Sequence, residues 1–365
     1  MPNSDSRSNP KGQDFRIKAG SGQRRPNILW ICTDQQRYDT ISCLGNNHIR
    51  TPNLDRLAAI GTAFTQAYCQ SPICTPSRAS FLTGMYPSSV HGCMNGNDRW
   101  SEAAPLVTGL LAESGYDCGL VGKLHLSGTA GKIEHRPSDD GYRVFEWSHS
   151  PRDRWARGMN QYVDWAKSKG AEFGGREDTL LNSTPELHQT TWCADRAIDF
   201  IESTGEAPWL LSVNIFDPHK PFDPPEEFLT RYNPEDLPDP LFRESDFASQ
   251  KALSNVDFQT ECRDPKRFKA RELKAAYYAM IELIDENVGR MLDALESTGQ
   301  RENTLVIFMS DHGEMLGDHG LLLKGCRFYD SLVRVPLILS WPGKIGRGTI
   351  NSGLVELTDI APALF

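Results

Sequence analysis

The chain has 365 residues, of which 39% are hydrophobic, and carries a formal net charge of -9. This acidic balance argues against nucleic acid and against a broad anionic membrane surface as partners. No apolar run approaches the roughly 18 residues that would predict a membrane span. The length allows one large domain or two smaller ones.

The first 25 residues are polar and lack the apolar core of a secretion signal. We therefore expect a disordered lead-in over residues 1–25. A cytoplasmic location is the simpler expectation, and a periplasmic or secreted one applies if a signal has been removed. The nine cysteines are odd in number and include no Cys-x-x-Cys pair, so they predict neither a disulfide framework nor a zinc site.

Five short apolar runs, each bounded by turn residues, predict strands. They are continuously hydrophobic and not alternating, which is typical of strands covered on both faces. These runs span residues 27–33, 116–121, 209–216, 304–309 and 336–340. Helical patterns lie between them, at residues 52–60, 190–203 and 271–298. Alternating strands and helices indicate an α/β fold with a mainly parallel sheet.

Two long regions interrupt this alternation. Residues 127–188 are rich in glycine, charge and tryptophan, and residues 217–270 contain many proline and aspartate residues. Both are too long for ordinary connections, so we expect inserted loops that shape a pocket. Four tryptophans in or near them either stack on a sugar ring or anchor the core; they are Trp147, Trp155, Trp165 and Trp192.

The most informative motif is CTPSRASFLTG, which begins at Cys74. It places a thiol just ahead of a predicted helix, in which Pro76 suits a first helical position and Gly84 supplies a C-terminal stop. Ser77 and Arg78 follow Cys74 by three and four residues, so the three side chains can share one helical face. The free N–H groups of a first turn, the helix dipole and a guanidinium all favour an anion. A reactive group beside them indicates anion-transforming chemistry.

Acidic residues follow two of the predicted strands: Asp34 follows the first and Asp311 the fourth. In a parallel sheet both carboxylates would project from the C-terminal edge into one crevice, where such folds bind ligands. Two acids beside an anion-binding helix would repel the substrate unless a cation lay between them, so we expect a hard divalent metal. The neighbouring Gln35 and His312 complete the expected ligand set.

Basic residues reach the same edge. Lys123 and His125, in VGKLHLSG, follow the second predicted strand; a lysine supplies a point charge for an anion and a histidine titrates near neutral pH. His219, in NIFDPHKPFDPP, follows the third strand, where flanking prolines fix the direction of the imidazole. Asn95, in HGCMNGND, is either a polar pocket residue or an ordinary turn residue.

These motifs resemble the signature segments of the type I, formylglycine-dependent sulfatases of the alkaline phosphatase superfamily. Cys-x-Pro-Ser-Arg followed by Thr83-Gly84 is similar to the family's modification motif, and TDQQR and SDHGE look like its two metal-binding segments. The resemblance implies a large, mainly parallel mixed sheet sandwiched by helices, with residues 26–365 as the catalytic domain. It also implies that the family's smaller C-terminal antiparallel subdomain is missing from this chain.

In that family a formylglycine-generating enzyme oxidises the cysteine to an aldehyde whose hydrate is the nucleophile, so the resemblance implies this modification of Cys74. It further implies one divalent metal ion, with calcium as the first choice and manganese or magnesium as alternatives. The implied metal ligands are Asp34, Gln35, the modified Cys74, Asp311 and His312. Asp311 is also the implied acceptor of the nucleophile's proton.

The resemblance assigns the catalytic residues as well. Arg78, Lys123 and Lys324, the last in GLLLKGCRFYD, are expected to stabilise charge on the sulfate oxygens. His219 is expected to protonate the leaving alcohol, and His125 to assist release of sulfate.

The expected reaction is hydrolysis of a small anionic substrate, a sulfate ester on a sugar, to alcohol and inorganic sulfate. One alternative keeps the nucleophile but takes a phosphonate monoester or phosphodiester, because the pairs Asp34-Gln35 and Asp311-His312 resemble that branch. The pair of Lys123 and His125 favours sulfate instead. The other alternative is an inactive anion-binding fragment.

Overall fold

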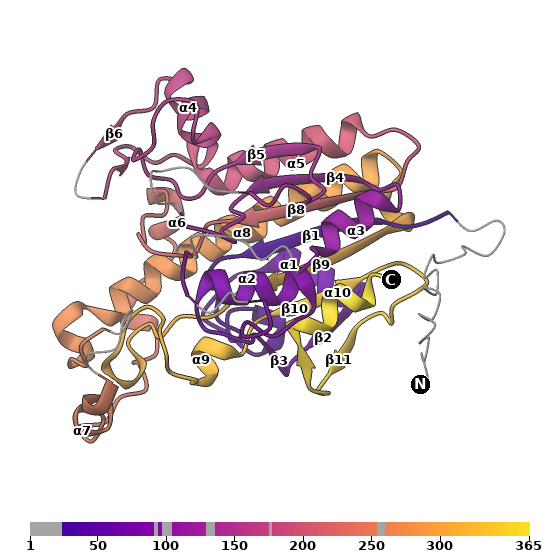
Figure 1. The fold of residues 1–365 in the computed structure, drawn as a ribbon. Helices are drawn as coiled ribbons and strands as arrows, with labels where there is room; N and C mark the ends of the chain where they lie inside the picture. The colour runs from indigo at the N-terminus through magenta and orange to yellow at the C-terminus, as the bar shows by residue number, and fades with distance from the viewer. Residues whose placement is uncertain (1–23, 91–93, 97–103, 129–135, 175–176, 254–259) are drawn as a thin grey trace, which may run out of the picture.

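An eight-stranded sheet organises the fold (Figure 1). The computed structural model describes residues 24–90, 94–96, 104–128, 136–174, 177–253 and 260–365. The expected disordered lead-in therefore lies almost wholly outside the described residues. In spatial order the strands are β11 (Thr349–Asn351), β2 (Thr62–Phe64), β10 (Leu337–Ser340), β9 (Thr304–Ser310), β1 (Asn27–Thr33), β8 (Trp209–Ile215), β4 (Asp117–Gly122) and β5 (Val144–Trp147).

The sheet is mixed but mainly parallel, as the sequence predicts. Every pairing in it is parallel except those of β10 with β9 and β2. In the centre, Thr33 pairs in register with Ser310 on one side and Ile215 on the other, so the strands β9, β1 and β8 end together. The next strand, β4, ends beside them, with Gly122 paired to Asn214.

Helices cover both faces of the sheet (Figure 1). One face carries α1 (Pro52–Ala59), α5 (Gln189–Ser203) and the 28-residue α8 (Ala270–Ser297); the other carries α2 (Cys74–Thr83), α3 (Val107–Glu113) and α10 (Ile360–Ala363). Strand β1 shows why its sequence is uniformly apolar: Leu29 and Ile31 enter one hydrophobic cluster, and Ile28 and Trp30 enter the other. The expected three-layer α/β architecture is confirmed.

The two regions expected to be inserted loops contain more regular structure than predicted. Residues 127–188 hold β5, which extends the main sheet, together with α4 (Gln161–Ser168), and residues 217–270 hold α6 (Glu226–Leu229) and α7 (Asp246–Gln250). Besides several short 3-10 helices, the remaining elements are β3 (Ala67–Tyr68), β12 (Val355–Glu356), β6 (Phe173–Gly174), β7 (Thr179–Leu180) and α9 (Asp330–Val333). No helix within the described residues is long and apolar enough to cross a membrane.

Candidate active site

The carboxyl ends of four neighbouring parallel strands supply the polar groups of the site. Asp311 follows β9, Asp34 follows β1, His219 lies just after β8, and Lys123 follows β4. Backbone hydrogen bonds continue past the strand ends: the Asp311 N–H donates to the Thr33 carbonyl at 3.1 Å. The parallel register therefore places these side chains at one edge of the sheet, where open α/β sheets bind ligands.

Helix α2 brings Cys74 to the same point. The helix begins at Cys74 itself, slightly earlier than the sequence predicts, after Ile73 in extended conformation. Its thiol lies 3.2 Å from His312 Nε2, 3.6 Å from Asp34 Oδ1 and 2.8 Å from Lys324 Nζ. The thiol thus sits at a helix N-terminus, which favours negative charge, between acidic and basic groups.

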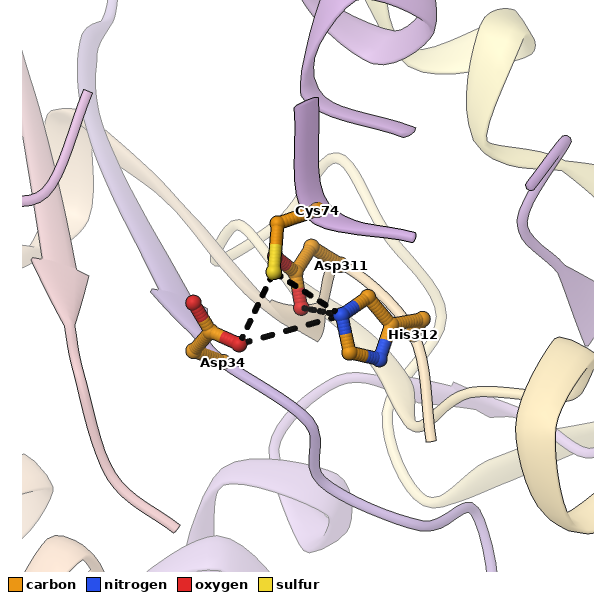
Figure 2. A group of neighbouring side chains, drawn as sticks. All are labelled: Asp34, Cys74, Asp311 and His312. Atoms are coloured by element: carbon orange, nitrogen blue, oxygen red, sulfur yellow. Dashed lines mark hydrogen bonds and ion pairs between the residues drawn. The ribbon is translucent and has the colours of Figure 1, made fainter. Parts of the chain in front are cut away.

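Four side chains converge in a way that suits a metal ion (Figure 2). Potential ligand atoms of Asp34, Cys74, Asp311 and His312 all lie within 4.8 Å of one another, and all four residues are buried. The Nδ1 atom of His312 lies 2.9 Å from the Gly313 carbonyl. An Nδ1–H donor to that carbonyl leaves Nε2 free to bind a cation, as in many metal-binding histidines.

Each carboxylate in this group divides its two oxygens between two kinds of partner. Asp34 Oδ2 contacts Lys123 Nζ and lies 3.3 Å from Arg78 Nη2, whereas its Oδ1 faces His312 Nε2 at 3.8 Å. Asp311 Oδ2 lies 2.9 Å from Arg78 Nε, whereas its Oδ1 lies 3.7 Å from His312 Nε2. The second oxygens also have protein partners: Asp34 Oδ1 lies 4.0 Å from Lys324 Nζ, and Asp311 Oδ1 accepts the Gln35 N–H at 3.0 Å. These second oxygens face His312 and the candidate metal position.

Gln35 lies beside this group, since its backbone N–H donates to Asp311 Oδ1 at 3.0 Å. Its Nε2 donates to Glu314, whose carboxylate also accepts the backbone N–H groups of Leu316, at 3.0 Å, and Leu323. These contacts fix the amide, and Gln35 Oε1 is left buried without a hydrogen-bond partner among the described residues. A buried acceptor of this kind normally has a partner, so a cation bound at this position would satisfy it.

The guanidinium of Arg78 differs from the expectation that it grips the substrate directly. It is 1% exposed, and besides the two carboxylates it contacts the Lys123 carbonyl, at 3.0 Å from Nη1. Three of its N–H groups therefore hold the acids and the loop after β4. This arrangement supports a positioning role for Arg78 more strongly than direct contact with sulfate.

The charges of these groups shift their pKa values. Burial opposes ionisation of Asp34, but Lys123 and the cations around it hold the pKa of that carboxyl well below its usual range. Burial and Asp34 oppose ionisation of Cys74, yet Lys123, Lys324 and His312 together lower the pKa of the thiol. The protein groups alone therefore favour an anion at position 74.

A cavity of about 660 Å³ opens above the thiol. His125 and His219 line it, and burial, reinforced by Lys123 and Lys324 respectively, lowers the pKa of both imidazoles well below their ordinary value. Asn95 also lines it, and its Oδ1 accepts from the hydroxyl of Thr75, at 3.3 Å, in the first turn of α2. The structure therefore places every expected site residue either in the wall of the cavity or in the cluster of buried side chains around the candidate metal position.

The cavity also exposes residues that the sequence did not single out, namely His149, Ser150 and Arg152. They follow β5, so the rule that ligands bind at the carboxyl ends of strands could have found them had that strand been predicted. By contrast, none of the four tryptophans noted in the sequence is among the cavity-lining residues. Trp192 is buried in the core, and Trp147 and Trp155 pack edge-to-face at 6.0 Å.

The sulfatase family model matches residues 26–365. The chain belongs to the sulfatase family. Members of this family hydrolyse sulfate esters and typically use a metal ion together with a modified cysteine, so the buried thiol beside the candidate metal position is where a sulfatase is expected to have its nucleophile.

Curated sulfatases and a solved hydrolase structure are similar over most of this sulfatase chain. An arylsulfatase of Clostridium perfringens is 33% identical, over 93% of this chain and 74% of that enzyme. A choline-sulfatase of Rhizobium meliloti is 30% identical, over 87% of this chain and 63% of its own length. The phosphonate monoester hydrolase of Agrobacterium radiobacter superposes with a TM-score of 0.75 at 28% identity, covering 93% of this chain and 73% of that one.

Proposed function

We propose that this chain hydrolyses sulfate esters with a formylglycine derived from Cys74 as the nucleophile and one divalent metal ion beside it. The observation that carries the proposal is the setting of the Cys74 side chain. It lies at the N-terminus of α2, 2.8 Å from Lys324 Nζ and 3.7 Å from Lys123 Nζ, with the acids beneath it. The two lysines would attract the negatively charged sulfate oxygens, and they would also stabilise negative charge on the reacting side chain at position 74.

Asp34, Gln35, Asp311 and His312, with the modified side chain at position 74, are the proposed metal ligands. Their donor set is mostly oxygen, which favours a hard cation and keeps calcium as the first choice. Manganese and magnesium, which carboxylate and carbonyl oxygens also suit, are the alternatives. A bound divalent ion would polarise the sulfate and lower the pKa of the attacking hydroxyl.

The chain's own residues divide the remaining tasks. The hydrated aldehyde supplies one hydroxyl to attack sulfur and a second to expel sulfate. Lys123 and Lys324 neutralise the sulfate oxygens, and Arg78 holds Asp34 and Asp311 in place for this. Asp311 accepts the proton of the nucleophile, His219 protonates the departing alcohol, and His125 assists sulfate release.

Replacing His219 tests the assignment of the leaving-group acid. We expect His219→Ala to lower kcat for an alkyl sulfate by roughly 10²–10⁴-fold, because an alkoxide is a poor leaving group without a proton. The loss with 4-nitrophenyl sulfate is expected to be much smaller, because nitrophenolate leaves unaided. The pKa of His219 in the unliganded enzyme lies well below its ordinary value. Because only protonated His219 can donate the proton, kcat/KM for the alkyl sulfate should also fall as pH rises through that pKa. Equal losses with both substrates would contradict the assignment.

The choice between sulfate and phosphonate is tested by comparing two substrates. The similarity to a phosphonate monoester hydrolase makes that reaction the second candidate. We expect matured protein to turn over 4-nitrophenyl sulfate faster than a 4-nitrophenyl phosphonate monoester, because the pair of Lys123 and His125, which both line the cavity, resembles the sulfate-hydrolysing branch. Steady-state kcat/KM values for both substrates give the measurement, and faster phosphonate turnover would reverse the proposal.

The proposed physiological substrate is a sulfated sugar, and the proposed maturation partner is a formylglycine-generating enzyme. Two relatives support the substrate class by name: an ulvan-active sulfatase that is 30% identical, and an N-acetylglucosamine-6-O-sulfatase that is 26% identical. The chain spans 61% and 67% of their lengths. The mass of the peptide containing Cys74 reports maturation, because aldehyde formation removes the sulfur. A retained thiol would identify an inactive, anion-binding form.

A further inference from the structure

Buried polar atoms without partners are concentrated in one stretch of the chain. Ser148 Oγ, His149 Nδ1, Ser150 Oγ and Arg152 Nε have no hydrogen-bond partner among the described residues. The great majority of buried polar atoms in folded proteins are paired, and each unpaired one is costly. A cluster of four within five residues therefore indicates groups that are arranged for a ligand. These residues, 148–152, are called the 148–152 segment below.

The 148–152 segment belongs to the same edge of the sheet as the active site. It directly follows β5, and the Ser148 N–H donates to the Gly122 carbonyl, at 3.0 Å, at the end of β4. Its residues His149, Ser150 and Arg152 line the cavity that contains Cys74. Three of the four residues that carry unpaired atoms therefore belong to the wall of the space that a substrate would fill.

Two contacts connect this segment to the proposed proton-transfer residues. The ring of His149 packs edge-to-face on that of His125, with centroids 4.5 Å apart. Arg152 Nη2 donates to the Lys220 carbonyl at 3.1 Å, and His219 Nδ1 lies 2.7 Å from the same carbonyl. Because His219 is proposed to protonate the leaving oxygen, Arg152 lies on the side of the leaving alcohol and not of the sulfate.

The outer part of the cavity is positively charged. Arg152 and Lys220 line it, and no Asp or Glu is among the described lining residues. Glu177 lies outside the lining and is shared by three cations, at 3.4 Å from Arg152, 3.5 Å from Lys220 and 3.8 Å from Arg154. Asp223 and Asp178 also interact electrostatically with Arg152, but like Glu177 neither lines the cavity. The cavity wall itself therefore presents cations without an acid among its described residues, and a second anionic group on the ligand would find complementary charge there.

We propose that the 148–152 segment is a second binding subsite, for a hydroxyl-rich leaving alcohol that carries a further carboxylate or sulfate group. Arg152 and Lys220 bind the second anion, and His149 and Ser150 bind neighbouring hydroxyl groups. The inference rests on the proposed function and narrows it to acidic, multiply charged sugars. It separates this chain from an enzyme adapted to simple aryl sulfates.

The test compares matched substrates that differ in one anionic group. A sulfated methyl glucuronide and the corresponding sulfated methyl glucoside differ only by a carboxylate, and a disulfated glucoside supplies a second sulfate instead. We expect Arg152→Gln to lower the ratio of kcat/KM for the doubly charged substrate to that for the singly charged one by about 10- to 100-fold, the range for a lost charge-assisted hydrogen bond. Arg152→Lys should restore part of the ratio. A larger fall in the ratio for the glucuronide identifies a carboxylate as the preferred second anion, and a larger fall for the disulfated glucoside identifies a sulfate.

Arg154 provides the matched control. It contacts the same Glu177, and its Nε lies 2.8 Å from Asp178, but it does not line the cavity. Arg154→Gln should therefore leave the ratio unchanged. An unchanged ratio in Arg152→Gln, or an equal change in both variants, would overturn the subsite.

Binding measurements separate failure of the subsite from failure of the proposed reaction. Calorimetric titration of Cys74→Ala protein with the same glucuronide and glucoside measures affinity without turnover. Tighter binding of the glucuronide that disappears with Arg152→Gln supports the subsite even if matured protein hydrolyses neither sulfate. Equal affinity for both ligands, together with normal hydrolysis of 4-nitrophenyl sulfate, refutes the subsite and leaves the sulfatase reaction standing.

Discussion

We expect Cys74→Ala and Cys74→Ser to abolish sulfate ester hydrolysis, with losses of roughly 10⁶-fold, the scale seen when a hydrolase loses its nucleophile. Alanine removes the reacting group altogether. An unoxidised serine keeps one hydroxyl but lacks the second hydroxyl that expels sulfate. Both variants should keep the fold, because position 74 begins a helix and either residue suits that place.

The measurement is single-turnover and steady-state hydrolysis of 4-nitrophenyl sulfate by matured protein, with melting temperature as the check on folding. The exposed Cys43 gives the matched control, since Cys43→Ser changes a cysteine that is not among the cavity-lining residues. It should retain full activity. Substantial steady-state turnover by Cys74→Ala, or by Cys74→Ser protein in which peptide mass shows an unmodified serine, would show that the nucleophile lies elsewhere.

Removing the metal is the second change with a large expected effect. Dialysis against a chelator should lower kcat/KM by about 10³-fold or more, because a bound divalent ion contributes several kcal/mol of charge stabilisation in such reactions. The melting temperature should also fall, because an ion that binds only the folded chain stabilises it. The far-UV circular dichroism should not change, since Arg78 and Lys123 still hold one oxygen of each buried acid.

Adding back single metals identifies the ion. We expect calcium to restore activity best, with manganese or magnesium as the alternatives. Gln35→Ala should weaken the restored activity at limiting metal, because it removes the buried oxygen that has no other partner among the described residues. Full activity after exhaustive chelation, confirmed by elemental analysis, would contradict a metal-dependent reaction.

The parallel sheet and the inner part of the site were predictable because both depend on local sequence. Asp34, Lys123, His219 and Asp311 each come after a buried, continuously apolar strand, and neighbouring parallel strands bring the residues after their carboxyl ends to one edge. The end of such a run can be read from sequence alone. The Cys74 motif adds a helix start with its own preference for anions.

The outer part of the site was not predictable for an equally physical reason. Strand β5 reads VFEW, is only four residues long, and lies at the edge of the sheet with three of its residues partly exposed. Its sequence therefore lacks the long apolar run that identified the central strands. If that strand is not predicted, the sequence does not place His149 and Arg152 at the carboxyl edge of the sheet, and both look like ordinary loop residues.

Contacts between distant segments were also beyond sequence reasoning. Glu314 receives hydrogen bonds from Gln35, which is 279 positions away, and from the backbone before Lys324. Similarly, Arg78 has the expected charge and location, but only the packed structure shows that it holds two carboxylates and a carbonyl. Residue type and spacing indicate what a side chain can do, and packing selects which partners it has.

The burial of Cys74 has a consequence for when its proposed oxidation could take place. Its side chain is 1% exposed, behind two lysines and beneath the cavity. A small anion can enter that space, but the catalytic groups of another protein cannot reach the sulfur once α2 has packed against the sheet. The proposed oxidation of Cys74 would therefore have to precede folding, and a molecule that folds first would keep its thiol.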